Sequence, residues 1–379
     1  MNDSLKRCGL IINGQAVRTP IAIASMAGVV DASYVLARKD HIGAAFIGGY
    51  SIDEKTIAAS REMAAEGRTE FLYDDPVAAL QEQVDALRES GVVIGLNLRG
   101  STPESYTAIA SAIGNGVIYE IDAHCRQPAM IAAGCGEALL NEPHRLAETI
   151  RALKTLDVTV SVKIRAGVAP DDRHLARLLW RAGADIIHVD LMDFGHSRLR
   201  QIRNACPLVL IANNSITSFD RAMEMFSHGA DMVSLARRSD ERTLAGLDAA
   251  IQRKEEETGW YNAPKQLCRG GDVRALTFCC LPVKHCPLIP FLERIGLSKE
   301  EYMHIKTEAV KGTPLEKGKI TCFQSLAWCC KSSSPCMLRE VALQREAGIT
   351  TREYMQEKRR LSERIMERVY DAVPDDDAD

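Results

Sequence analysis

Short apolar runs rich in β-branched residues alternate with longer stretches of helical period through the first 240 residues. This alternation is typical of βα units around a parallel sheet. Eight runs are present, at 21–25, 44–48, 92–96, 117–121, 158–164, 185–189, 208–212 and 232–235. The helical stretches between them include 76–89, 143–155, 174–181 and 219–227. Eight units over this length predict a closed TIM-type (β/α)8 barrel rather than an open doubly wound sheet.

The segment before the first strand, LIINGQAV, predicts a hairpin whose turn is Asn13-Gly14. Asn-Gly is a preferred pair for the two-residue turn that joins antiparallel strands. We expect this hairpin to plug the bottom of the barrel.

The alternation stops after about residue 255, where the chain becomes rich in Cys, Pro and Lys and repeats itself. FCCLPVKHC at 278–286 and WCCKSSSPC at 328–336 share the pattern aromatic-CC-x5-C. GLSKEEYM at 296–303 and GITTREYM at 348–355 share a second pattern. Matching positions lie about 50 residues apart, which indicates a duplicated unit.

Each repeat is interpreted as a cysteine knuckle followed by a helix, so this region is expected to hold two helical segments. Ser298 with Glu301, and Thr350 with Glu353, have the spacing of a capping box at a helix start. A chain of 379 residues is long enough for two domains. We therefore expect a barrel at 1–255, a small, mainly helical Cys-rich domain at 256–370, and a disordered acidic tail at 371–379.

Composition narrows the function further. The formal net charge is −4 and no block of Lys and Arg stands out, which weakens the case for a nucleic-acid or anionic-membrane partner. The N-terminus has no apolar signal-peptide core and no run of 18 apolar residues occurs, so we expect a cytoplasmic protein without a membrane partner. Twelve cysteines without an export signal indicate metal ligation or catalysis rather than disulfides. Isolated Cys135 and Cys206 are expected to be core residues.

In a TIM barrel the chemistry lies where strands end, so residues just after each strand are the candidates for the site. Ala27 and Gly28 follow the first strand and would let the backbone approach a flat ring closely. Lys163 and Arg165 alternate with apolar neighbours on the fifth strand and so point to one face. A lysine that points into the barrel is expected to have an anionic partner or a role in binding or catalysis, because burying it unpaired costs several kcal/mol.

The remaining candidates end the other strands. The loops after the last two strands of this fold frequently bind phosphate, which predicts phosphate or ribityl contacts from the residues there. His188 is expected to satisfy a core hydrogen bond, and the carboxylates could either cap loops or take part in the site. The candidates are Asn97, Arg99, Asp122, Cys125, Asp190, Asn213, Asn214, Ala236 and Arg237.

Six stretches in order carry a family resemblance over about residues 15–250: ASMAGVVD, EIDAHCRQP, SVKIRAG, GADIIHVD, IANNSITS and GADMVSLARRS. They resemble the flavin-dependent tRNA-dihydrouridine synthases, a branch of the FMN barrels. The resemblance implies an FMN-dependent oxidoreductase in which Cys125 is the acid that protonates a uracil carbon. It also implies that Lys163 contacts the isoalloxazine and that Arg237 holds the FMN phosphate.

Four positions depart from the family's pattern. Asp122 stands in place of an asparagine, His124 in place of a glycine, Asp190 in place of a histidine and Asn214 in place of a glycine. The family's helical tRNA-holding domain is replaced by the cysteine repeat. Flavin binding is therefore better supported than uridine reduction.

The cysteine repeat resembles the ninth methanogenesis marker domain, which has eight cysteines with paired aromatic-CC motifs. The resemblance covers about residues 265–360 and implies an anaerobic archaeal setting. All eight cysteines have counterparts here, and we expect them to bind metal: Cys268, Cys279, Cys280, Cys286, Cys322, Cys329, Cys330 and Cys336.

Two hypotheses follow. The first is an FMN oxidoreductase whose Cys-rich domain carries two 4Fe-4S clusters that exchange electrons with the flavin. Its substrate would be a small molecule or tRNA, and a redox protein is a further candidate partner. The second is a non-catalytic scaffold or RNA-contacting module with two structural zinc ions. Four thiolates per repeat satisfy either metal. The tethered flavin favours iron, because zinc has no redox chemistry.

Overall fold

A computed structural model describes residues 9–192, 194–262, 264–278, 286, 288–329 and 335–371, without the side chain of Lys265. The chain divides into two compact units. The first comprises Met1–Met225 and Ala230–Ala249, and the second comprises Phe226–Gly229 and Ala250–Asp379. No helix among the described residues is long and apolar enough to cross a membrane.

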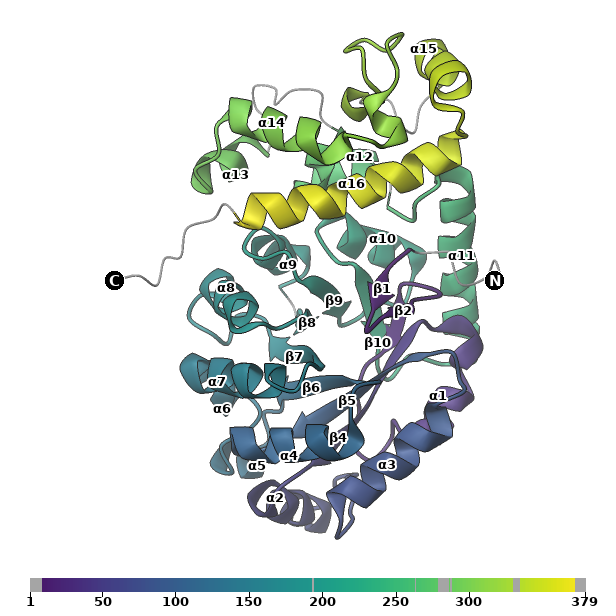
Figure 1. Ribbon diagram of the computed structural model, residues 1–379. Coiled ribbons are helices and arrows are strands. Elements are labelled where there is room, and N and C mark those ends of the chain that lie inside the picture. Colours follow the sequence, from purple (N-terminus) through teal and green to yellow (C-terminus); the bar gives the residue numbers. More distant parts are fainter. Residues whose placement is uncertain are drawn as a thin grey trace. The chain divides into compact units, whose positions relative to one another are not determined.

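Eight parallel strands in the first unit close into a barrel in the order β10-β3-β4-β5-β6-β7-β8-β9, with helices around it (Figure 1). The strands are β3 (Ile21–Ile23), β4 (Ala44–Ser51), β5 (Val93–Arg99), β6 (Ile118–Ala123), β7 (Thr159–Arg165), β8 (Ile186–Asp190), β9 (Val209–Asn213) and β10 (Met232–Leu235). The predicted TIM barrel is confirmed. Strands β4 and β5 continue past the predicted apolar runs, and their last polar side chains have buried partners: Ser51 contacts Ser60 in the helix after β4, Asn97 contacts Glu120 on β6, and Arg99 contacts Glu70.

The helices of this part of the chain lie between successive strands, except α11, which follows the last strand. They are α1 (Ala32–Leu36), α2 (Glu54–Ala65), α3 (Pro76–Leu87), α4 (Pro103–Ile113), α5 (Pro128–Ala132), α6 (Ala138–Asn141), α7 (Pro143–Lys154), α8 (Asp172–Ala182), α9 (His196–Arg203), α10 (Phe219–Ser227) and α11 (Glu241–Thr258), with a 3-10 turn η2 (Lys39–His41). Several begin at a side-chain cap, as at Asp75 and Thr102, where proline follows as the first helical residue.

The predicted hairpin is also confirmed. Strand β1 (Ile11–Ile12) pairs with β2 (Gln15–Ala16), and both turn residues have positive φ, 52° at Asn13 and 70° at Gly14. Asn13 Oδ1 accepts a hydrogen bond of 3.0 Å from Oγ1 of Thr159, the first residue of β7. The hairpin therefore lies at the N-terminal end of the barrel, opposite the end where chemistry is expected.

The second unit holds more helices than the two segments predicted. They are α12 (Pro264–Gly270), η3 (Val273–Phe278), α13 (Ile289–Arg294), α14 (Lys299–Val310), η4 (Pro314–Glu316), η5 (Leu326–Trp328), α15 (Met337–Val341), the π-helix η6 (Ala342–Ala347) and α16 (Thr351–Asp371). Helix α16, the long yellow helix in Figure 1, contacts both α14 and η3. The additional helices have at most seven residues, too few to leave a clear periodic apolar pattern in the sequence.

Both predicted capping interactions form. Glu301 accepts hydrogen bonds of 2.7 Å from the N–H and the hydroxyl of Ser298, whose Oγ accepts from the Glu301 N–H at 3.2 Å. Glu353 and Thr350 make the same three contacts at the start of α16. The two repeats thus begin their main helices in the same way, which supports the duplication seen in the sequence.

The cysteines divide between core and surface. Cys135 and Cys206 are fully buried, as expected for core residues. Cys268 and Cys322 are exposed, and Cys286, Cys329 and Cys336 are partly exposed. Cys279, Cys280, Cys330 and the tail from residue 372 lie outside the described residues. Within the described part of the chain, no three His, Cys, Asp or Glu side chains are grouped so that they could hold a metal ion.

Candidate active site

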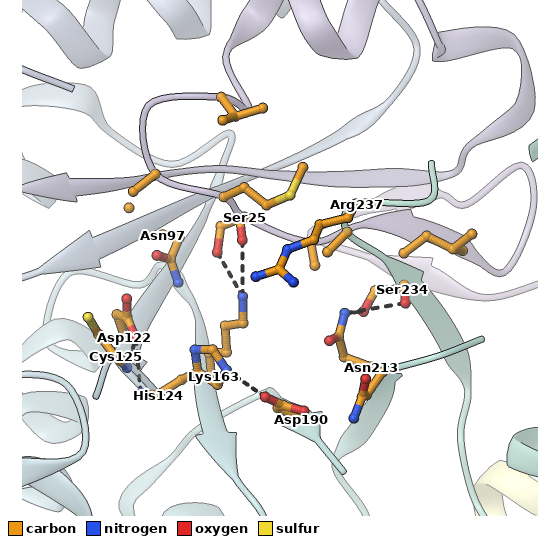
Figure 2. A pocket seen from close by; sticks show the side chains of 18 of the residues that line it. Ser25, Asn97, Asp122, His124, Cys125, Lys163, Asp190, Asn213, Ser234 and Arg237 are labelled. Atoms are coloured by element: carbon orange, nitrogen blue, oxygen red, sulfur yellow. Dashed lines mark hydrogen bonds and ion pairs between the residues drawn. The ribbon is translucent and has the colours of Figure 1, made fainter. Parts of the chain in front are cut away.

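A cavity of about 1240 Å³ opens at the C-terminal ends of the barrel strands, and Figure 2 shows side chains that line it. Every residue predicted for catalysis or cofactor binding lines this cavity except Gly28. These lining residues are Ala27, Asn97, Cys125, Lys163, Arg165, Asp190, Asn213, Asn214, Ala236 and Arg237. The fold therefore brings together side chains from strands that are far apart in the sequence.

Gly28 shapes the wall of the cavity from behind. Its φ is +69°, and a Cβ atom there would lie 2.6 Å from the backbone nitrogen of Glu70. Only glycine tolerates both the conformation and the close approach. The structure thus gives Gly28 a packing contact with the 69–70 segment, and its place beside a flat ring stays a prediction.

Lys163 lies on β7 and is 4% exposed. Its Nζ donates a hydrogen bond of 2.8 Å to Ser25 Oγ and lies 3.5 Å from the Ser25 carbonyl oxygen (Figure 2). Among the described residues, no carboxylate oxygen lies within 4.0 Å of this ammonium group. A buried ammonium in this setting is stabilised by an anionic or electron-rich ligand. Ser25 was missed by the sequence reasoning, because a serine after a strand carries no special signal.

A fully buried carboxylate, Glu120 on β6, lies inside the barrel. It accepts hydrogen bonds from Asn97 Nδ2 at 2.9 Å and Ser161 Oγ at 3.0 Å, and lies 2.9 Å from His188 Nδ1. The other ring nitrogen of His188 lies 2.7 Å from Ser234 Oγ. Burial alone would raise the pKa of Glu120, but His188, Lys163 and Asn97 outweigh it and hold the pKa below its usual value. His188 is thus a core histidine, as expected, while Glu120 was not predicted.

Asn97 connects this network to the cavity. Its Nδ2 donates a hydrogen bond to Glu120, while its Oδ1 is buried and has no hydrogen-bond partner among the described residues. Asn97 is 1% exposed and lines the cavity. Buried polar atoms in proteins are nearly always paired, so this oxygen marks a position for a ligand donor or a water molecule.

Asp122 holds the loop that carries Cys125. Its Oδ1 accepts the backbone N–H groups of His124 at 2.9 Å and Cys125 at 3.0 Å. Burial raises the pKa of the Cys125 thiol, and the negative charge of Asp122 raises it further, while Arg99 opposes the shift. The thiol therefore keeps its proton at neutral pH and is chemically suited to be a proton donor rather than a nucleophile.

Arg99 forms a buried ion-pair cluster that the sequence reasoning did not foresee. Its Nη1 lies 2.6 Å from Glu70 Oε2, and its Nε lies 3.5 Å from Asp122 Oδ2. All three side chains are at most 6% exposed. Burial alone would raise the pKa of Asp122, but Arg99, His124 and Lys163 hold it below its usual value. The cluster ties the 66–73 segment to the strands around the cavity.

His124 and Asp190 form a pair at the cavity mouth. His124 Nε2 lies 2.7 Å from Asp190 Oδ2, and Asp190 Oδ1 accepts the Met192 N–H at 3.1 Å. Burial alone would raise the pKa of Asp190, but these hydrogen bonds and the nearby charges hold it at about 2. Arg165 lies between Glu137 at 2.6 Å and Asp190 at 3.5 Å. Asp190 therefore both caps its loop and orients a histidine toward the cavity region.

The opposite side of the cavity is built from β9 and β10. Asn213 Nδ2 donates to Ser234 Oγ at 2.8 Å, and Asn214 Nδ2 donates to the Met192 carbonyl at 2.7 Å. Asn214 has a φ of 103°, a conformation that usually requires glycine and that asparagine adopts more readily than most residues. Arg237 is exposed, and no described residue pairs with its guanidinium, which Figure 2 shows directed into the cavity.

Fold and cavity define this protein as a TIM-barrel enzyme with its site at the C-terminal ends of the strands. Comparison with protein families then identifies its family: residues 75–267, about half of the chain, match the dihydrouridine synthase (Dus) model. The chain belongs to the dihydrouridine synthase family. Because members of this family are FMN-dependent oxidoreductases, the chain is assigned to that class of enzyme.

Individual relatives include one named synthase and two uncharacterized proteins. A tRNA-dihydrouridine(16) synthase of Yersinia pestis is 28% identical over 199 residues, which is 47% of this chain and 62% of that protein. Two uncharacterized proteins of Methanocaldococcus jannaschii are also similar. One is 47% identical over 108 residues, which is 28% of this chain and 69% of the relative. The other is 30% identical over 227 residues, which is 57% of this chain and 88% of the relative.

Proposed function

We propose that the cavity binds FMN and that the protein catalyses a flavin-dependent oxidation or reduction in an archaeal cell. The observation that carries this proposal is Lys163, a buried cation bonded to Ser25 on the cavity floor with no described carboxylate within 4.0 Å. The unpartnered Oδ1 of Asn97 and the exposed guanidinium of Arg237 also fit the ligand. The Asn97 oxygen can accept a hydrogen bond from a ring N–H, Lys163 can place a positive charge at the edge of the ring, and Arg237 can bind a phosphate.

The roles divide between the two sides of the cavity. Lys163, Arg165 and Asn97 would contact the ring system, and Asp190 lies beside Arg165 at the same edge. Asn213, Asn214, Ala236 and Arg237 would hold the ribityl chain and phosphate. When bound, FMN supplies or accepts the two electrons of the reaction as a hydride. This chain's own residues orient the substrate and move the proton that accompanies the hydride.

Cys125 is the proposed proton donor. Its raised pKa keeps the proton on sulfur until the substrate takes it, and Asp122 fixes the loop that presents it. The substrate class suggested by the tRNA-dihydrouridine synthases is a uridine in tRNA. The imidazole of His124, beside Asp190, adds a second polar side chain to the same cavity, at a position where the family's pattern has a glycine.

Cys125→Ser is expected to leave FMN content and reduction by dithionite nearly unchanged, because the thiol is not among the proposed FMN contacts. Reoxidation of the reduced protein by unmodified tRNA should slow by on the order of a hundredfold or more, the usual contribution of a positioned acid. Stopped-flow absorbance of the flavin measures both steps. Cys135→Ser, in the neighbouring core, is the control. Loss of flavin in Cys125→Ser alone would instead make Cys125 a structural residue.

For the second unit we propose two metal sites built from the eight late cysteines, with 4Fe-4S clusters rather than zinc. The duplicated four-cysteine pattern supports metal binding, and the flavin in the same chain favours a redox-active metal. The methanogenesis marker resemblance and the two Methanocaldococcus jannaschii relatives support an anaerobic archaeal setting. The clusters would exchange electrons with the flavin or with a redox protein partner.

Protein purified without oxygen should be brown and contain about eight irons and eight acid-labile sulfides per chain, as two 4Fe-4S clusters require. Metal analysis and electron paramagnetic resonance after reduction measure this directly. Two zinc ions without labile sulfide would contradict the cluster proposal and favour the zinc scaffold. A preparation without either metal would contradict both.

A further inference from the structure

The carboxylate of Glu120 has three hydrogen-bond partners inside the barrel, and one of them belongs to the cavity. Oε1 accepts from Asn97 Nδ2 at 2.9 Å, and Oε2 accepts from Ser161 Oγ at 3.0 Å and lies 2.9 Å from His188 Nδ1. All four residues are at most 1% exposed. Of the four, only Asn97 lines the cavity. Glu120 can therefore influence a ligand in the cavity through Asn97, without touching the ligand itself.

The charge of Glu120 fixes the direction of its hydrogen bond with Asn97. Burial alone would raise the pKa of Glu120, but His188, Lys163 and Asn97 hold the pKa below its usual value, so the group is ionised at neutral pH. A carboxylate has no proton to donate and can only accept. Asn97 must therefore turn its Nδ2 toward Glu120, because the reverse orientation would bring two acceptor oxygens together. The Oδ1 of Asn97 is then the atom that remains for a ligand.

The hydrogen-bonded chain continues from Glu120 through His188 to the other side of the cavity. Burial lowers the pKa of His188, so its ring is neutral at neutral pH and carries its proton on Nδ1, beside Glu120. Its Nε2 accepts from the hydroxyl of Ser234 at 2.7 Å. Ser234 Oγ in turn accepts from Asn213 Nδ2 at 2.8 Å (Figure 2). The chain thus ends on the N–H group of a second asparagine that lines the cavity.

The orientation of Asn97 determines which ligand atoms are favoured beside it. A side-chain amide that is free to turn can offer either a donor or an acceptor. Held by Glu120, Asn97 offers only Oδ1, which is buried and has no hydrogen-bond partner in the part of the chain that the structure describes. A ligand N–H would satisfy this oxygen, whereas a ligand oxygen or a methyl group would leave it buried and unpaired, which is unfavourable.

We infer that Glu120 is a positioning residue that makes the cavity selective for a ring N–H group, because it holds the Asn97 amide with its oxygen available to the ligand. The inference rests on the FMN site proposed above. The oxidised flavin ring has a single N–H group, at N3, between two carbonyl groups. Asn97 would accept that hydrogen bond, and Glu120 would set the selectivity without contacting the flavin.

The test compares FMN with N3-methyl-FMN, which lacks the ring N–H, as ligands of flavin-free wild type and flavin-free Glu120→Gln. Wild type should bind FMN on the order of tenfold more tightly than N3-methyl-FMN, the effect of one hydrogen bond to a buried acceptor. In Glu120→Gln the new amide can donate to Asn97, which can then turn and present its N–H groups to the ligand. The affinity for FMN should fall by about tenfold while the affinity for N3-methyl-FMN stays nearly unchanged. Quenching of flavin fluorescence gives the dissociation constants.

Ser161→Ala is the matched control, because it removes another hydrogen bond of the same carboxylate and leaves the bond to Asn97 in place. Its ratio of the two dissociation constants should equal that of wild type. Glu120→Asp keeps the charge but is shorter by one methylene group, so it should shift the ratio in the same direction as Glu120→Gln. This second variant carries the test if Glu120→Gln does not fold.

The outcomes separate this inference from the proposed function. Wild-type protein that binds neither flavin would remove the proposed FMN site itself. Wild type that binds FMN with a ratio that the Glu120 variants leave unchanged would overturn the inference while the FMN site stands. Equal weakening of both flavins in the Glu120 variants would also overturn it, because Glu120 would then be purely structural.

Discussion

Lys163→Met is expected to weaken FMN binding by on the order of tenfold to a hundredfold, the effect of losing one charge-assisted contact. The variant removes the buried cation that faces Ser25 and keeps an unbranched side chain of similar length. The flavin-free variant should be as stable as flavin-free wild type or more stable, because a buried ammonium without a close carboxylate is costly. Titration of the flavin-free protein with FMN, followed by flavin fluorescence, gives the dissociation constant.

Lys154→Met is the control for Lys163→Met. Lys154 lies in α7 and forms a partly exposed ion pair of 2.9 Å with Asp185, away from the residues that line the cavity. Its loss should leave FMN affinity unchanged. An unchanged affinity in Lys163→Met, with the barrel folded, would exclude Lys163 from the flavin site.

Arg99→Met is expected to destabilise the barrel by about 3–5 kcal/mol, the usual cost of breaking a buried ion pair by removing one partner. Glu70 and Asp122 would lose their cation while remaining almost fully buried. Urea unfolding followed by circular dichroism measures the change in the free energy of unfolding. The difference from wild type should shrink as the pH falls, because Arg99 holds the pKa of Asp122 below its usual value and protonation of Asp122 removes that interaction.

Arg88→Met provides the matched surface pair. Arg88 lies 2.6 Å from Asp85, and both side chains are more than half exposed, so its loss should change the free energy of unfolding by at most about 1 kcal/mol. A similarly small change in Arg99→Met would mean that Glu70 and Asp122 find solvent or other partners easily. The cluster would then have no special part in shaping the cavity.

The barrel and most of the cavity lining could be predicted from the sequence, because both depend on local patterns. Apolar runs alternate with helical stretches at a regular spacing, and the residues that follow each run must converge when parallel strands close. Lys163 was recognisable because burying an unpaired lysine within an apolar strand is unfavourable, so a lysine there indicates a role in binding or catalysis. The two capping boxes were recognisable because Ser298 and Thr350 precede a glutamate at the required spacing.

The contacts between distant segments could not be predicted. Glu120 and Arg99 find their partners across the barrel, on strands and loops that only the closed sheet brings together. Gly28 shows the same limit, because its neighbour in space is the 69–70 backbone, forty residues further along the chain. The hydrogen bonds of Lys306 and Lys358 to backbone carbonyls could not be predicted either, because lysine is usually exposed and both of these side chains are fully buried.

Isothermal titration of flavin-free protein with FMN, under anaerobic conditions, measures whether the barrel binds FMN. We expect saturation at about one FMN per chain, with weaker binding of riboflavin because Arg237 then has no phosphate to hold. Arg237→Ala should bring the affinity for FMN close to that for riboflavin. Folded protein that binds neither flavin would show that the barrel is not a flavin site, and equal binding of both flavins before and after Arg237→Ala would exclude Arg237 as the phosphate contact.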